Sequence, residues 1–187
     1  MVHTRLIKPL VKQLRDRKKT AAVHEAAHSV VGASLGMPLG DVDILRRKFA
    51  MDNAVFISVG FSSYSFAEVE EAIGTKRAHE VIAVYAAAGI VAEQYIGRVR
   101  KCAIDELAFR QDLQTCLRFA KMSGVSREQT PLFVDSLCLT AEGILGREGG
   151  KVWNAVTSSL RHKTVLSGAE VKAIVNRNCM SQFPMTG

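Results

Sequence analysis

The chain has 187 residues, of which 48% are hydrophobic and 23% are charged, and this length and composition exclude a chain that is disordered throughout. No apolar run reaches the roughly 18 uncharged residues that a transmembrane helix requires, because Glu80, Glu93 and Arg98 interrupt or flank the longest one. The N-terminal sequence carries charges throughout and lacks the apolar core of a secretory signal. We therefore expect a cytoplasmic protein with no transmembrane segment.

The net charge of +7 is concentrated at the N-terminus. Residues 1–20 contain seven lysines or arginines and one acid, Asp16, so this segment carries +6 of the +7. We divide the chain into a basic N-terminal arm or helix at 1–19, a domain at 20–180 and a flexible tail at 181–187. A basic arm can bind nucleic acid or an anionic surface. Without stacking aromatics or a recognised nucleic-acid module, nucleic acid is the less favoured partner.

The first long element is a predicted helix. Pro9 is typical of the first turn of a helix, and the pattern stays helical through Leu35, where a glycine and a proline follow. Between Asp41 and Gly60 the apolar residues alternate with polar ones in two runs. This change of period predicts two strands of a small sheet.

Further helical patterns follow, opened by capping or proline signals or bounded by glycine. They are expected from Ser65, from Thr75 to about Ile96, from a start within 105–111 to near Gly124, from Thr130 to about Leu145, across Val152–Leu160, and from Ser167. The predicted fold is mainly α, with one small β-sheet near the first helix.

The first helix contains the sequence His24, Glu25, Ala26, Ala27, His28, which is the pattern HExxH. On a helix the two histidines lie one turn apart on the same face, so both can bind one metal ion. Zinc in catalytic sites takes three protein ligands and a water. The zinc lowers the pKa of that water, and a neighbouring carboxylate, here Glu25, can accept its proton. The sequence therefore predicts one zinc ion per chain and Glu25 as general base.

The third ligand is not determined by spacing alone. A carboxylate on an apolar helix is costly to bury unless it is paired or metal-bound, which favours Glu93 or Asp112 over acids in loops. The lone histidines each stand beside a charge, which is typical of surface residues. The full set of candidates is Glu93, Asp105, Glu106, Asp112, His79 and His162.

Four blocks of the sequence resemble the peptidase domain of the FtsH-type ATP-dependent zinc metalloproteases, over roughly residues 15 to 175. RKKTAAVHEAAHSVVG is similar to the metal-binding helix of that family, although the family usually has Gly where this chain has Ala27. AAAGIVAEQYIG resembles the GGRxAEE segment with Gly89, Ala92 and Glu93 in register. RQDLQTCLRFAKMSG resembles the (S)NDLxxATxxAxxM segment, and SSLRHKTVLSGAEVKAIV is similar to the final helix pair.

The resemblance implies a helical, zincin-like peptidase domain in which Asp112 joins His24 and His28 as the third zinc ligand. It implies that Glu25 is catalytic and that Glu93 orients a ligand from the second coordination sphere. It also implies a strand beside the active-site cleft that pairs with an extended substrate backbone. That strand consists of Ala54, Val55, Phe56, Ile57, Ser58 and Val59.

The chain departs from the family in having no GxxxxGK[ST] motif and no room for an ATPase module or membrane helices. We expect an endopeptidase that hydrolyses extended or unfolded polypeptides, alone or with a separate ATPase or unfoldase partner, and homo-oligomers are compatible with the family. One alternative is a catalytically silent, zinc-stabilised interaction module. The other is a nucleic-acid or anionic-surface binder that acts through the basic arm.

Overall fold

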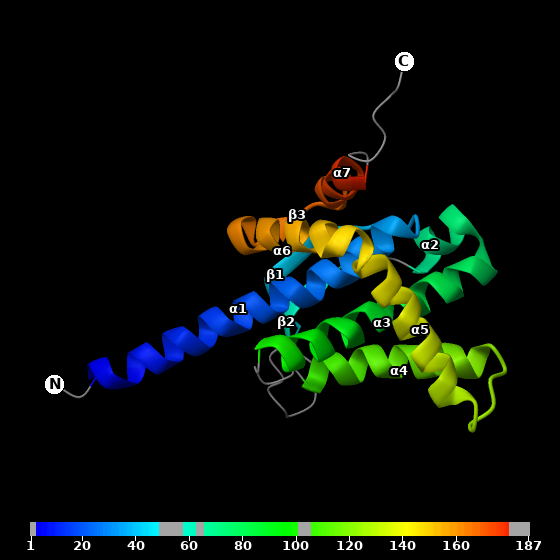
Figure 1. The fold of residues 1–187 in the computed structure, drawn as a ribbon, viewed down its shortest axis with the longest axis horizontal. Coiled ribbons are helices and arrows are strands. Elements are labelled where there is room, and N and C mark those ends of the chain that lie inside the picture. The colour runs from blue at the N-terminus through cyan, green and yellow to red at the C-terminus, as the bar shows by residue number, and fades with distance from the viewer. Residues whose placement is uncertain (1–2, 49–57, 63–65, 101–105, 180–187) are drawn as a thin grey trace, which may run out of the picture.

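The computed structural model describes residues 3–48, 58–62, 66–100 and 106–179. Within these ranges the chain forms helices joined by short connections, one 3-10 turn and a small sheet (Figure 1). In chain order the elements are α1 (His3–Ser34), β1 (Val42–Lys48), β2 (Ser58–Ser62), α2 (Phe66–Ile73), α3 (Thr75–Arg100), α4 (Glu106–Met122), α5 (Thr130–Leu145), η1 (Arg147–Gly150), α6 (Lys151–Lys163), β3 (Val165–Leu166) and α7 (Gly168–Cys179).

The predicted fold class, mainly α with one small sheet beside the first helix, is confirmed. The start of α1 is corrected, because the helix begins at His3 and Pro9 lies inside it. The strand expected from Ala54 falls mostly outside the described residues: β2 begins at Ser58, and 54–57 are not described. The tail at 181–187 also lies outside them.

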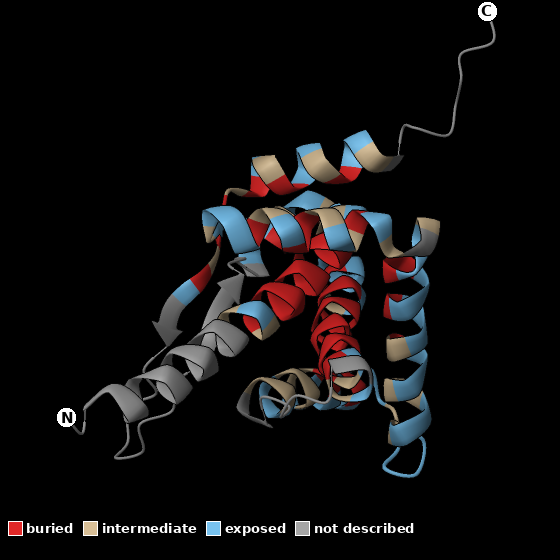
Figure 2. Ribbon diagram, turned by 60° about the vertical axis from the view of Figure 1, so that its left-hand side comes forward, coloured by how far each residue is buried: buried red, intermediate tan, exposed pale blue. Residues whose placement is uncertain are grey.

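The core forms where α1 and α3 pack against each other, and Figure 2 shows buried residues concentrated on these two central helices. Small side chains make this close packing possible, since the distance between two helices depends on the residues at their contact. Helices α4 and α5 cover α3, and α6 and α7 cover α1. The fully buried alanines at the centre are Ala22, Ala26, Ala27, Ala87, Ala88 and Ala92.

The sheet has three antiparallel strands in the order β2-β1-β3, and β1 and β2 pack on α1. Val42 of β1 lies opposite Ser62 on one side and Leu166 on the other. The third strand was not predicted, because the two residues of β3 are too few to show an alternating pattern. Its pairing with β1 fixes the chain between α6 and α7.

The cap predicted for α7 is confirmed. The backbone N–H of Ser167 donates to Glu170 Oε2 at 2.9 Å, and the N–H of Glu170 donates to Ser167 Oγ at 3.2 Å. This reciprocal pair satisfies two donors at the start of the helix. No helix in the described ranges is long and apolar enough to cross a membrane.

Candidate metal centre

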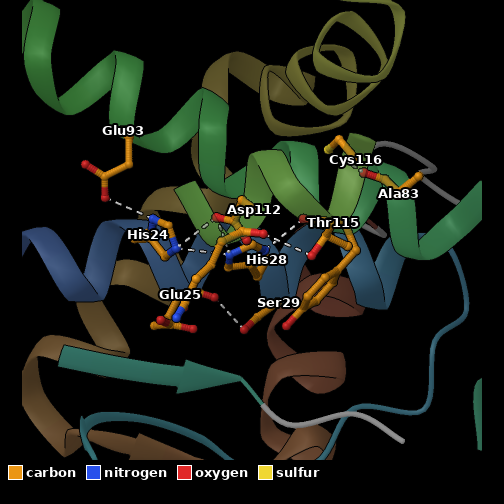
Figure 3. Close-up of polar contacts among 11 residues, drawn as sticks. His24, Glu25, His28, Ser29, Ala83, Glu93, Asp112, Thr115 and Cys116 are labelled. Carbon is orange, nitrogen blue, oxygen red and sulfur yellow. Dashed lines mark hydrogen bonds and ion pairs between the residues drawn. The ribbon is translucent and has the colours of Figure 1, made fainter. Parts of the chain in front are cut away.

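Three side chains from two helices converge on one point beside the core (Figure 3). His24 and His28 come from α1, and Asp112 comes from α4. The two Nε2 atoms lie 3.1 Å apart, and each lies 3.4 Å from Asp112 Oδ2. Both histidines are buried, and the Asp112 side chain is 16% exposed. The structure thus brings together the HExxH histidines and the aspartate that the family resemblance implied.

The triangle formed by these atoms matches the ligand spacing of zinc. Zinc bound by histidine nitrogen and carboxylate oxygen at about 2.0–2.2 Å in a tetrahedron has ligand atoms about 3.3 Å apart. The three observed separations, 3.1, 3.4 and 3.4 Å, lie close to that edge length. A water molecule can supply the fourth corner in a site of this kind.

The hydrogen bonds of the two rings show which nitrogen of each ring faces the centre. His28 Nδ1 lies 2.7 Å from the backbone oxygen of Tyr85, which can only accept, so this nitrogen carries the ring proton. His24 Nδ1 lies 3.0 Å from Glu93 Oε1, and donates to that carboxylate. In the neutral rings both Nε2 atoms therefore present lone pairs to the same point.

Asp112 Oδ2 is buried and has no hydrogen-bond partner among the described residues. Two imidazole lone pairs and one carboxylate oxygen would thus face one another across 3.1–3.4 Å. An unpaired buried acceptor is unfavourable by about 1–3 kcal/mol, and more when it is charged. A cation at the centre would remove this penalty for all three groups, so the donor set fits a metal ion.

Because Gly89 of α3 has no side chain, the ligand atoms have room to meet beside it. A Cβ atom at this position would overlap Asp112 Oδ2 and would lie 2.6 Å from His28 Nε2. Any side chain would therefore fill the point at which the ligand atoms meet. The sequence marked Gly89 only as part of a family segment, and its contact with the ligands becomes visible in the packing of α3 between α1 and α4.

The charges around His24 favour a cation at this position. Burial lowers the pKa of His24, but the hydrogen bond with Glu93 and the charges of Asp112 and Glu25 outweigh that effect and raise it to about 9. The site is therefore strongly attractive to positive charge. A metal ion and a proton compete for the same nitrogen.

Glu25 stands next to His24 on α1 and is 6% exposed. Its charge contributes to the raised pKa of His24. The backbone at this point is fixed by Ser29, whose Oγ donates to the Glu25 carbonyl oxygen at 2.6 Å. The residue predicted as general base is thus buried and adjacent in sequence to a candidate ligand.

A long-range hydrogen bond that the sequence did not predict holds α1 next to His24. The indole N–H of Trp153 in α6 donates to the backbone oxygen of Val23 at 3.0 Å. The Trp153 ring also lies 5.2 Å from the ring of Tyr95, two residues beyond Glu93 on α3. The pair links the segments that carry His24 and Glu93. A single tryptophan more than a hundred positions away gives no local signal of such a contact.

Two of the remaining candidates, His79 and His162, are not part of the metal centre. The His79 ring packs 5.5 Å from the Phe119 ring, and His162 is exposed at the end of α6. Asp105 lies outside the described residues. Of the proposed substrate strand, Ser58 and Val59 lie in β2, an outer strand of the sheet that packs on α1.

No protein-family model matches the chain, and no curated protein shows significant sequence similarity to it.

Proposed function

We propose that the protein is a zinc-dependent endopeptidase in which His24, His28 and Asp112 hold one zinc ion and Glu25 is the general base. The observation that carries this proposal is the convergence of the Nε2 atoms of His24 and His28 on the buried Asp112 Oδ2, which has no hydrogen-bond partner among the described residues. The adjacent carboxylate of Glu25 can act as a general base, and a purely structural zinc site does not need such a group.

Bound zinc would polarise the peptide carbonyl and lower the pKa of a water molecule. The residues of the chain then have separate roles. Glu25 takes a proton from the attacking water at its carboxylate and passes it to the leaving amine nitrogen. Glu93 and the carbonyl of Tyr85 accept the Nδ1 protons of the two histidines, which fixes both rings with Nε2 inward.

Extended polypeptides are the proposed substrate class. Strand β2 stands at the end of the sheet order, so one of its edges has no strand partner in the described ranges, and it packs against the helix that carries HExxH. An extended chain can add to such an edge through backbone hydrogen bonds. The resemblance to FtsH-type peptidase domains supports the same substrate class, and a separate ATPase partner would serve to unfold compact substrates.

The test compares wild type with Glu25→Gln, and uses Glu71→Gln on the exposed face of α2 as a control for the amide substitution. Zinc content is measured by elemental analysis, and hydrolysis is followed on an unfolded protein such as casein. We expect one zinc per chain in all three proteins and hydrolysis by wild type and Glu71→Gln only. Equal hydrolysis by Glu25→Gln would refute the role of Glu25.

The same experiment addresses the alternative of a silent zinc module. That alternative predicts one zinc per chain in every variant. It also predicts that no variant hydrolyses the unfolded substrate, even when the substrate is in excess. Removal of zinc would then lower the stability of the fold without changing any activity.

A further inference from the structure

One face of α3 contacts the candidate metal centre at three positions, each one helical turn from the next. Glu93 accepts a hydrogen bond from His24 Nδ1 (Figure 3), and Gly89 lies beside the ligand atoms. One turn earlier along α3, Tyr85 contacts His28. Residues four positions apart on a helix share a face. Each histidine of α1 therefore has its own partner on the same face of α3.

Tyr85 contacts His28 in two separate ways. Its backbone oxygen lies 2.7 Å from His28 Nδ1, and its ring stacks on the imidazole with the ring centroids 4.6 Å apart and 27° between the planes. This separation lies within the range of about 4.5–7 Å that aromatic pairs prefer. Any residue at position 85 could supply the carbonyl, whereas the stack requires an aromatic side chain. A single hydrogen bond lets the imidazole swing about the bonded nitrogen, and a flat ring against its face limits that motion.

The Tyr85 ring is itself held against α1. Tyr85 and His28 are each 5% exposed. Gly32 lies one turn beyond His28 on α1, and a Cβ atom there would lie 3.1 and 3.3 Å from two carbons of the Tyr85 ring and 2.9 Å from the Leu39 side chain. The ring thus packs where Gly32 leaves room. The helix that carries His28 also fixes the ring that stacks on it.

The stack also favours the metal-bound form of His28. A cation bound at Nε2 draws electron density from the imidazole and leaves that ring more positive. The face of a tyrosine ring attracts a positive group that lies within about 6 Å of its centroid. The Tyr85 ring should therefore stabilise the metal-bound imidazole more than the neutral one, in addition to holding it in place.

We propose that the ring of Tyr85 is a positioning group that holds the His28 imidazole in the orientation for metal binding, as Glu93 does for His24. This inference rests on the proposed zinc site and adds a side chain that acts through one ligand. A ring that only fills the core would predict a different result. Its removal would then lower the stability of the fold without changing the geometry of the metal site.

The test compares three substitutions in the full chain. Tyr85→Phe keeps the stacked ring and the backbone carbonyl, and Tyr85→Leu keeps the carbonyl and an apolar side chain only. Phe119→Leu is the matched control, because it also removes a buried ring that packs against a histidine, in this case His79, which is not part of the metal centre.

Three measurements are made on each protein. Zinc affinity is determined by competition with a chelator, and the stability of the metal-free protein by denaturant unfolding. The visible absorption spectrum of the cobalt(II)-loaded protein reports the coordination geometry, which depends on how the ligands are held.

We expect Tyr85→Leu to lower zinc affinity by about tenfold or more, as the loss of an outer-sphere partner does, and to change the cobalt spectrum. Tyr85→Phe and Phe119→Leu should keep the zinc affinity and the cobalt spectrum of wild type, although Phe119→Leu should be less stable. If Tyr85→Leu does not fold, Gly32→Ala takes its place, because the added Cβ would displace the Tyr85 ring without removing it. The same loss of affinity and change of spectrum are expected there.

Wild-type affinity and spectrum in Tyr85→Leu would overturn the proposal. So would equal losses in Tyr85→Leu and Phe119→Leu, which would indicate a general effect of an emptied core. Equal losses in Tyr85→Leu and Tyr85→Phe would assign the effect to the hydroxyl group and would also overturn it. A wild-type chain that binds neither zinc nor cobalt would refute the zinc site itself, and this result is distinct from a failure of the role of Tyr85 alone.

Discussion

Replacement of Gly89 by alanine should abolish tight metal binding while it leaves the fold largely intact. The added Cβ would overlap Asp112 Oδ2 and lie 2.6 Å from His28 Nε2, so the aspartate must leave its position. Loss of an outer-sphere partner already weakens metal binding by about 10–100-fold. Loss of a ligand should exceed that, and we expect zinc affinity to fall by at least about 100-fold.

The effect on stability should be much smaller than the effect on metal binding. Overpacking costs about 1–3 kcal/mol, and the exchange of glycine for alanine within a helix returns about 1 kcal/mol. The metal-free variant should therefore lose no more than about 2 kcal/mol in free energy of unfolding.

Gly143→Ala is the matched control, since it is the same exchange within a helix and its Cβ would meet no atom within 4 Å. The assay is a competition titration of zinc against a chelator, together with denaturant unfolding of the metal-free proteins. Gly143→Ala should bind zinc as wild type does. If Gly89→Ala also binds zinc with wild-type affinity, the assignment of the three ligands is wrong.

Three further changes test the surroundings of the site and the fold. Glu93→Gln keeps an acceptor for His24 Nδ1 but removes its charge, so zinc affinity should fall by about tenfold; an unchanged affinity in a chelator competition would contradict the orienting role. Trp153→Phe removes the hydrogen bond to the Val23 carbonyl and keeps an aromatic ring, so unfolding free energy should drop by about 1 kcal/mol in a denaturant titration; no change would mean that the bond contributes nothing. The pKa of Glu170 is lowered to about 2 by its hydrogen bonds with Lys163 and with the cap of α7. The ionised side chain therefore stabilises the fold above pH 4.5, and this stabilisation is lost as the pH falls towards 2. The difference in unfolding free energy between wild type and Glu170→Gln should shrink over that range, and a constant difference would contradict the assignment.

The sequence was sufficient for the part of the site that is local in the chain. His24, Glu25 and His28 are fixed relative to one another by helical geometry, and the structure places both histidines as that spacing requires. Most helix starts carry a local signal as well, such as Thr130 with its proline or the Ser167 cap. These features depend on interactions within four residues.

The contacts of the site between residues far apart in the chain could only be suggested from the sequence. Glu93 lies 69 positions from His24, and the two meet because α3 packs on α1. The partner of His28 is a backbone oxygen, that of Tyr85, and a carbonyl leaves no mark in the sequence. The space beside Gly89 depends on the packing of α1, α3 and α4 together, so no single segment of the sequence shows it.

Local rules also misplaced the start of α1. Proline within a helix removes a hydrogen bond and is unfavourable by about 3 kcal/mol, so the sequence predicts that Pro9 lies in the first turn. The helix nevertheless begins at His3.

The central claim is that His24, His28 and Asp112 form one zinc site, and the most direct test is a titration of the metal-free chain with zinc, followed by elemental analysis of the washed protein. We expect one zinc per chain in wild type and loss of the zinc in Asp112→Ala, while circular dichroism shows that the metal-free variant keeps its fold. A wild-type chain that retains no zinc, or an Asp112→Ala chain that retains it as tightly as wild type, would contradict the account.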